Sequence, residues 1–400
     1  MATTGEATIC HAQMRGPEKG FPKSNGQTMG LETHTVDEIM NSQLHRDIRL
    51  AQFQGRWHEN CDNCRIKEST DTEDKFRVVP SISEIQDCFK NMLPDGSMRK
   101  IEVTRIDVRF SNLCNAACLQ CGAVASNKWY DDHYGFFGTE YGHRSASTWT
   151  LAPDEHGRPR PTAPRDNAKL DNFWQMCEDH LDTIDTIILL GGEPLIMPEH
   201  ERLLDFFIQK DRAKNIRLFY NTNLSVINHK ILSRWEHYKI VDLSLSIDDV
   251  SNRYDLIRYG VTWDKLCANI HTVRDIGNIR TSISPCYMIP NMLSMTDIDR
   301  WADAEGIRMN LKFVHEPFYM TVNSLPKEAR LELININKQA GTKMSLEAAD
   351  WIEKQIDQPS DPAACDQFVR FMDYLDKSRK QDWRATLVET ADFLKRYDIG

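Results

Sequence analysis

Three cysteines in one short segment have the spacing of a metal-binding loop. Cys114, Cys118 and Cys121 form a C-x3-C-x2-C pattern directly after residues 102–111, where polar and apolar residues alternate. Thiolates are the usual protein ligands of a 4Fe-4S cube, and three of them bind three of its four irons. The fourth iron then stays open to an outside ligand, as one position of a catalytic metal does. We therefore expect a 4Fe-4S cluster here.

A zinc site and chance packing both account less well for the three cysteines. A structural zinc site would need a fourth cysteine or histidine close by. The nearest histidine, His133, lies twelve residues beyond Cys121. Coincidental packing of three small core residues is the remaining alternative.

A second motif, Gly191-Gly192-Glu193-Pro194, follows the apolar stretch 183–190. Glycines allow the backbone to approach a ligand closely. Carbonyl groups at the end of a parallel strand, together with a carboxylate, suit a cationic ammonium group. The alternative is a tight turn between a strand and a helix that begins near Pro194.

The elements that position these motifs alternate along the chain between strand and helix. We expect strands at 102–111, 183–190, 217–221, 241–247, 281–288 and 308–314, and helices at 167–181, 198–209, 225–235, 263–275 and 294–304. Such alternation predicts an α/β fold with a parallel sheet. We favour a partial (β/α)6 TIM-like barrel over an open doubly wound sheet. Asp242, Ser244 and Ser246 share one strand face, which favours a polar interior site.

The flanking regions divide the chain into three expected domains. Residues 1–100 form an N-terminal extension with cysteines, 101–315 form the core barrel, and 316–400 form a helical C-terminal region. Residues 36–54 have helical spacing. Residues 151–166 are rich in proline and charge, so we expect a loop there.

Composition excludes several kinds of protein. The formal net charge is −10 and no basic run stands out, so no nucleic-acid partner is expected. The longest apolar stretch is far too short to span a membrane. The eleven cysteines come without a recognisable signal peptide, which favours a cytoplasmic protein with reduced thiols.

The cysteine pattern and the GGEP motif together resemble the radical S-adenosylmethionine (SAM) superfamily. In that family GGEP binds the methionine amino group of SAM. The resemblance implies SAM bound at the open iron, an external electron donor such as flavodoxin or ferredoxin, and reductive cleavage to a 5′-deoxyadenosyl radical. That radical takes a hydrogen atom from a substrate, here a peptide, a protein side chain or a small molecule.

The same resemblance implies further SAM-binding residues at strand ends. Asn223 lies in a segment like the Thr-Asn segment of the family, and Ser246 and Asp248 lie in a Ser-Ile-Asp segment. Arg258 could pair with the SAM carboxylate through its planar guanidinium. Cys286, on the polar face of the fifth strand, is our candidate hydrogen-atom donor. The alternative is that Cys286 is simply a small half-buried residue.

Cysteines near the N-terminus resemble the twitch and SPASM extensions of radical SAM proteins, many of them from phages. Cys10, Cys61 and Cys64 would then hold a second Fe-S cluster, and a phage protein would work in the host cytoplasm. The family pattern has a further cysteine upstream of Gly5, which this sequence lacks. A zinc or rubredoxin-like site, or no metal, are the alternatives.

Two other functions remain open at this level. One is a non-catalytic Fe-S or metal-binding scaffold that keeps the barrel. The other is a nucleotide-modifying radical SAM enzyme, against which the acidic charge balance counts.

Overall fold

The computed structural model describes residues 21–62, 82–139, 151–161, 171–227 and 229–400. The chain forms two compact units. Unit 1 comprises Met1–Ser111, Arg144–Trp149 and Ala163–Ile188, and unit 2 comprises Asn112–His143, Thr150–Thr162 and Leu189–Gly400. The three-domain division expected from the sequence stays a prediction.

Unit 1 contains short helices and the first two strands of the chain's main sheet. Its elements are β1 (Lys23–Ser24), β2 (Gln27–Thr28), α1 (Val36–Met40), α2 (Gln43–Phe53), η2 (Glu59–Cys61), α4 (Ile82–Asn91), β3 (Arg105–Val108), α6 (Asp171–Asp179) and β6 (Thr186–Leu189). A capping box between Thr35 and Glu38 starts α1. The helix expected at 36–54 is broken because Ser42 takes extended backbone angles and occupies the N-cap position of a new helix, α2, without a capping bond from its side chain.

The main sheet has the strand order β11-β9-β8-β7-β6-β3. Its remaining strands are β7 (Arg217–Thr222), β8 (Ile240–Leu245), β9 (Ile279–Ile283) and β11 (Arg308–Met309), which pair in parallel. This order follows the chain without the reversal that defines a doubly wound sheet. The expected α/β fold with a parallel sheet is confirmed, and the singly wound order agrees with a partial barrel.

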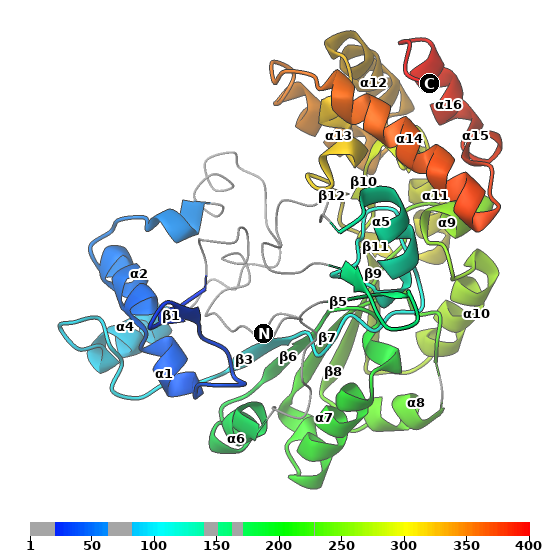
Figure 1. Cartoon of the computed structure of the whole chain (residues 1–400). Helices are drawn as coiled ribbons and strands as arrows, with labels where there is room; N and C mark the ends of the chain where they lie inside the picture. The colour runs from blue at the N-terminus through cyan, green and yellow to red at the C-terminus, as the bar shows by residue number, and fades with distance from the viewer. Residues whose placement is uncertain (1–20, 63–81, 140–150, 162–170, 228) are drawn as a thin grey trace. The chain divides into compact units, whose positions relative to one another are not determined.

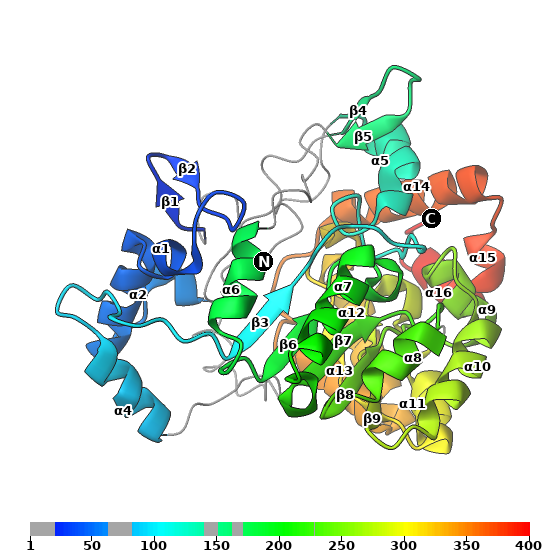
Figure 2. The same ribbon diagram turned by 90° about the horizontal axis from the view of Figure 1, so that it is seen from below.

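Helices follow the strands of unit 2 in turn. They are α7 (Pro198–Gln209), α8 (His229–Trp235), α9 (Ser251–Ile257), α10 (Trp263–Arg274) and α11 (Met295–Glu305). Figures 1 and 2 show α7, α8 and α10 along one side of β7, β8 and β9. Leu203, Leu204 and Phe207 of α7 are fully buried, at the spacing of one helix face. The short helix α9 was not expected from the sequence.

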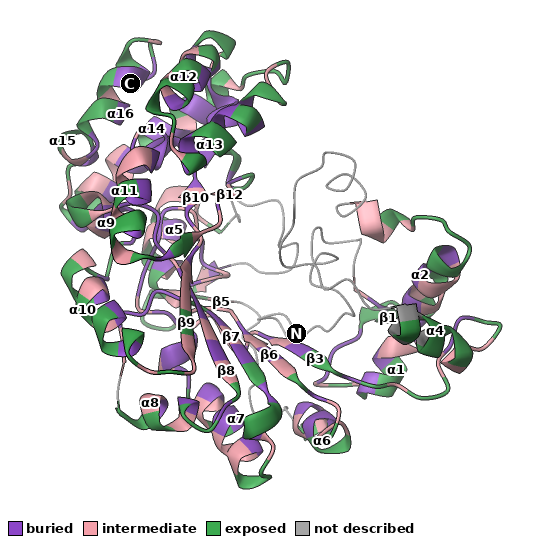
Figure 3. Ribbon diagram, turned by 180° about the vertical axis from the view of Figure 1, so that it is seen from behind, coloured by how far each residue is buried: buried purple, intermediate pink, exposed green. Residues whose placement is uncertain are grey.

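Polar residues line up across the strands, as the sequence predicted. Asn221 of β7 lies beside Ser244 of β8, which lies beside Ser282 of β9. Ser244 Oγ is 3.1 Å from Ser284 Oγ. Buried and more exposed residues alternate along β7, and the burial colouring of Figure 3 shows this. One sheet face therefore carries the polar side chains that a site needs.

The C-terminal part of unit 2 is helical, as expected. It contains α12 (Lys327–Ala340), α13 (Lys343–Glu353), α14 (Pro362–Arg379), α15 (Trp383–Thr386) and α16 (Val388–Lys395). Asp361 caps α14 by accepting the N–H of Ala364, and Pro362 occupies its first turn. Phe368, Phe371 and Leu375 bury one face of this helix.

The segment after the cysteine loop is more ordered than expected. It contains α5 (Tyr130–Phe137) and an antiparallel hairpin of β4 (Leu151–Pro153) and β5 (Pro159–Pro161). The loop predicted for 151–166 is therefore wrong over 151–161. Asp154 Oδ1 accepts the N–H groups of His156 and Arg158, and Gly157 has a φ of 73°, which together close the turn. None of the described helices is long and apolar enough to cross a bilayer.

Candidate active site

The cysteine loop is held in place through its backbone. The N–H of Ala117 donates to the Tyr259 carbonyl over 2.7 Å, and the N–H of Leu119 donates to the Ile257 carbonyl over 2.9 Å. The N–H of Cys121 donates to the Cys118 carbonyl and closes a tight turn. The loop is thus fixed to the last residue of α9 and to the segment that follows it. All three predicted cysteines lie in one unit.

The three thiols lie in unequal environments. Burial raises the pKa of Cys114 to about 12. A hydrogen bond with Cys121 lowers the pKa of Cys118, against its burial and with help from Arg258. That same hydrogen bond and burial raise the pKa of Cys121. Arg258 Nη1 lies 3.5 Å from Cys118 Sγ. Of the three thiols, Cys118 is the one that contacts a neighbouring cation, which favours its thiolate form.

The donors of the loop are compatible with the three-thiolate cluster expected from the sequence. Within the described residues, no group of three His, Cys, Asp or Glu side chains is placed to hold one metal ion. Cluster ligands bind separate irons, so they need not converge on one point. The buried alanines 116, 117 and 123 keep the loop narrow.

Two glycines let other segments press against this loop. A Cβ on Gly192 would lie 2.1 Å from the Leu113 carbonyl oxygen. Gly260 has a φ of +101°, and a Cβ there would lie 2.6 Å from the Asn115 carbonyl oxygen. The GGEP turn and the segment after α9 therefore fit against the loop only because both residues lack a side chain.

Glu193 of the GGEP motif is buried and accepts three hydrogen bonds. Its carboxylate accepts from Thr222 Oγ1 over 2.7 Å, from the Asn223 N–H over 2.8 Å and from the Leu195 N–H over 3.2 Å. Burial nevertheless raises its pKa. Pro194 starts the short helix η4 (Pro194–Ile196). The motif therefore forms a turn between a strand and a helix and also supplies a buried carboxylate, that of Glu193.

Asn223 connects the GGEP turn to the cysteine loop. Its Nδ2 donates to Asn115 Oδ1 over 2.9 Å, and Asn115 Nδ2 donates to Ser225 Oγ over 2.7 Å. Ser225 Oγ donates back to Asn223 Oδ1 over 2.6 Å. This closed network orients the predicted residue Asn223, while Asn115 and Ser225 were not foreseen.

Asp248 collects donors from four segments. Gln120 Nε2, Arg258 Nη2 and the N–H of Cys286 all point to its carboxylate, at 2.5, 2.7 and 2.8 Å. Asn291 Nδ2 donates to its backbone carbonyl over 2.7 Å. In this structure Arg258 therefore pairs with Asp248. The predicted residue Ser246 lies two residues earlier, half-buried, with its N–H bonded to the Thr222 carbonyl.

Cys286 lies beside this cluster on the short strand β10 (Cys286–Tyr287), which pairs in parallel with β12 (Lys312–Phe313). Burial raises the pKa of its thiol, and the carboxylate of Asp248 acts in the same direction. Tyr287 points to the other side, where its hydroxyl meets Asn337 Nδ2 at 3.2 Å. The alternation expected for this strand is present.

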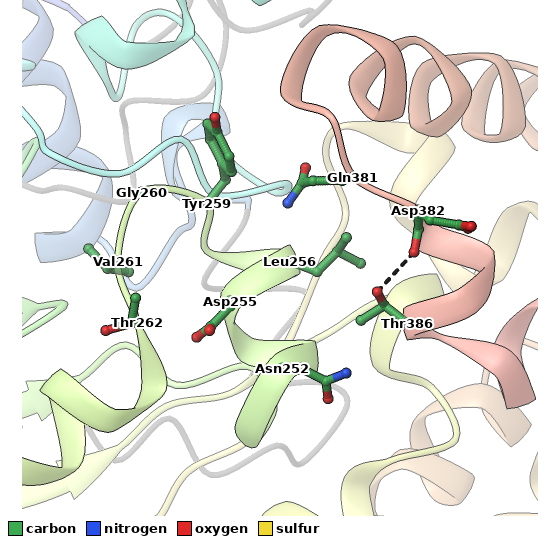
Figure 4. A pocket seen from close by; sticks show the side chains of 10 residues that line it. All are labelled: Asn252, Asp255, Leu256, Tyr259, Gly260, Val261, Thr262, Gln381, Asp382 and Thr386. Atoms are coloured by element: carbon green, nitrogen blue, oxygen red, sulfur yellow. Dashed lines mark hydrogen bonds between the residues drawn. The ribbon is translucent and has the colours of Figure 1, made fainter.

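An open pocket lies beside Tyr259 and Gly260, in the segment whose backbone holds the cysteine loop. Its volume is about 480 Å³. It is lined by Asn252, Asp255, Leu256, Tyr259, Gly260, Val261, Thr262, Gln381, Asp382 and Thr386. Figure 4 shows Tyr259 and Gly260 on one side and Asp382 on the other, where Asp382 accepts a bond from Thr386. The lining is mostly apolar, with Leu256, Tyr259 and Val261 among its residues, and Asp255 and Gln381 are polar residues within it.

The predicted second cluster falls mostly outside the described residues. Cys10 and Cys64 lie outside them. Cys61 ends the short helix η2 and is half-buried in unit 1. A metal site at these three cysteines stays a prediction.

Comparison with known proteins identifies the domain that carries the site. Residues 108–305 match the Radical SAM superfamily. A solved structure described as native anSMEcpe with bound AdoMet and Cp18Cys peptide shares 15% identity and a TM-score of 0.37 over 60% of each chain. Streptococcus suis SuiB bound to precursor peptide SuiA shares 13% identity and a TM-score of 0.39, over 82% of this chain and 64% of that chain. The alignments span less than two thirds of those chains. No curated protein matches the sequence.

Proposed function

Because residues 108–305 form a domain of the radical SAM superfamily, we propose that this chain is an enzyme that cleaves SAM reductively. The 5′-deoxyadenosyl radical would then abstract a hydrogen atom from a substrate. SAM and a 4Fe-4S cluster are the cofactors of this family. We propose Cys114, Cys118 and Cys121 as the cluster ligands.

One observation carries the proposal. The three thiols lie on a buried loop, and a buried arginine lies 3.5 Å from the Cys118 sulfur. A cation at this distance favours the thiolate that a cluster ligand must be. A chance group of core cysteines would not need such a partner, because buried thiols are otherwise neutral.

The surrounding residues would bind and orient SAM. When bound, the cluster supplies the electron for cleavage of the S–C5′ bond. We propose that Gly191, Gly192, Glu193 and Pro194 receive the ammonium group, for which the fixed Glu193 carboxylate and nearby carbonyls are suited. Asn223, Ser246, Asp248 and Arg258 lie at neighbouring strand ends and in the following loop, where parallel-sheet enzymes bind ligands. The Asp248–Arg258 pair and the bonds of Asn223 to Glu193 and Asn115 orient these side chains before SAM arrives.

We propose Cys286 as a hydrogen-atom donor. Such a donor must hold its S–H proton, and burial beside Asp248 raises the pKa of this thiol. The backbone N–H of Cys286 is anchored to Asp248, which also holds Arg258. Cys286 is therefore attached to the same cluster of residues as the proposed SAM site.

The proposed substrate class, electron donor and cellular location rest on the sequence resemblance. The twitch and SPASM likeness favours a peptide substrate, with a protein side chain or a small molecule as the other classes. An external donor such as flavodoxin or ferredoxin would supply electrons in the cytoplasm. A second Fe-S cluster at Cys10, Cys61 and Cys64 belongs to the same proposal.

The test is anaerobic reconstitution with iron and sulfide, followed by SAM and dithionite. We expect bound iron and formation of 5′-deoxyadenosine in the parent protein. Both should be lost in the Cys114→Ala/Cys118→Ala/Cys121→Ala variant, apart from iron at a second site. Cys267→Ala, a half-buried cysteine on α10, is the matched control. Iron without cleavage would indicate a metal-binding scaffold, and no iron would refute the proposal.

A further inference from the structure

Arg379, at the end of α14, is a buried arginine enclosed by two aromatic rings. Its side chain is 2% exposed. The guanidinium carbon lies 4.4 Å from the ring centre of Trp129 and 4.5 Å from that of Tyr259. Cation–π contacts of this kind are strongest when the cation is shielded from water. The helix ends directly afterwards, because Lys380 takes a left-handed conformation with a φ of 54°.

The polar contacts of Arg379 lead to the cysteine loop. Its Nε donates to Asp132 Oδ2 over 2.8 Å, and its Nη1 donates to the Ala117 carbonyl over 3.2 Å. Its Nη2 is buried with no hydrogen-bond partner among the described residues. A C-terminal side chain thus touches the loop backbone one residue before Cys118.

Arg379 completes a set of three donors on the loop. Ser126 Oγ donates to the Ala116 carbonyl over 2.6 Å, and Trp129 Nε1 donates to the Cys118 carbonyl over 3.0 Å. Arg379 donates to the carbonyl of Ala117, which lies between Ala116 and Cys118 in the sequence. Three consecutive peptide groups are therefore fixed by side-chain donors, which sets the direction in which the Cys118 side chain points.

We propose that Arg379 is a positioning residue that holds the cysteine loop in its ligand-binding shape and raises the reduction potential of the cluster. The cluster part of this inference rests on the proposed function. A reduced cluster carries one more negative charge, so a fixed buried cation nearby favours reduction. The hydrogen bond to Ala117 acts on the loop whether or not iron is present.

The test compares Arg379→Met, Arg379→Lys and the control Arg330→Met. Arg330 is also fully buried, 1% exposed, and donates to two backbone carbonyls, those of Gln355 and Gln358. Deuterium exchange is followed in residues 115–121 of the iron-free proteins, by mass spectrometry. We expect exchange about tenfold faster in Arg379→Met, because a charge-assisted bond is lost, and no change there in Arg330→Met.

The reconstituted proteins provide the second readout, the midpoint potential of the cluster followed by electron paramagnetic resonance. We expect a lower potential in Arg379→Met and one close to the parent in Arg379→Lys, which keeps the charge and should fold even if the methionine variant does not. Unchanged exchange and an unchanged potential in Arg379→Met would overturn the inference. If no variant or parent binds iron, the proposed function fails, and the exchange result alone decides whether Arg379 positions the loop.

Discussion

The Asp248 carboxylate and the Arg258 guanidinium lie 2.7 Å apart, and both side chains are buried. Asp248 follows β8, and Arg258 follows α9 and also touches Cys118. A buried pair of this kind contributes little net stability while intact, because both charges have lost their water. Removal of one partner is costly, since it leaves the other charge buried and unpaired.

Asp248→Asn should therefore destabilise the fold strongly. The neutral side chain cannot balance Arg258, and one of its polar atoms becomes a donor facing other donors. We expect a loss of about 3–5 kcal/mol in the free energy of unfolding. Chemical denaturation measures it. The control Asp297→Asn affects a more exposed partner of Arg253 and should cost under about 1 kcal/mol. Equal losses in the two variants would contradict the role assigned to the buried pair.

Gly192→Ala should displace the cysteine loop. Its Cβ would meet the Leu113 backbone at 2.1 Å, where no flexible side chain can move aside. We expect a loss of about 1–3 kcal/mol in stability, with weaker iron retention after reconstitution. Thermal denaturation and iron analysis measure these two effects. Gly277→Ala, where a Cβ would meet nothing within 4 Å, is the matched control. A Gly192→Ala protein as stable as this control would show that the loop can shift freely.

Tyr254→Phe should stabilise the SAM-free protein. The Tyr254 hydroxyl is buried and has no hydrogen-bond partner among the described residues. An unsatisfied buried hydroxyl carries a desolvation cost, so its removal should raise the free energy of unfolding by about 1 kcal/mol. Tyr287→Phe removes a hydroxyl that is bonded to Asn337 and should lower stability by a similar amount. Denaturation of both variants compares them, and a loss of stability in Tyr254→Phe would reveal a partner for that hydroxyl.

Stability should fall as the pH drops below about 6.5, in part because of His200. Burial lowers the pKa of His200 to about 3, and its Nε2 lies 2.6 Å from the Tyr220 hydroxyl. Between about pH 6.5, the ordinary pKa of a histidine, and about pH 3 the unfolded chain binds a proton at His200 that the folded chain does not. Acidification therefore favours unfolding. The expected slope is about 1.4 kcal/mol per pH unit for this group. Denaturation at pH 7.5 and 5.5 should show a smaller difference in His200→Gln, and an equal difference would refute the assignment.

The local patterns of the sequence were sufficient for the main elements and for the cysteine loop. The expected helix at 198–209 coincides with α7, because Pro198 and the first-turn acids mark its start. The strand expected at 281–288 is instead split into β9 and β10. Pro285 lies between them, and a proline has no N–H to continue the ladder.

Contacts between distant segments could not be predicted from local patterns. Gln120 reaches Asp248 across 128 positions, and Arg379 reaches Ala117 across 262. Only the fold brings such residues together, so residue type alone did not indicate them. The position of Gln120 between Cys118 and Cys121 was a usable signal, because any side chain there must lie near the thiols.

The long separation between Ala117 and Arg379 also has a consequence for biosynthesis. A ribosome that adds about 5–20 residues per second makes Arg379 roughly 13–50 s after the cysteine loop. During that interval the nascent loop lacks the Arg379 guanidinium, which in the finished chain donates to the Ala117 carbonyl and lies between the Trp129 and Tyr259 rings. Iron–sulfur assembly factors that act during translation would therefore meet a less constrained loop than factors that act on the finished chain. Whether the cluster is inserted before or after Arg379 is made would then affect how firmly the loop holds it.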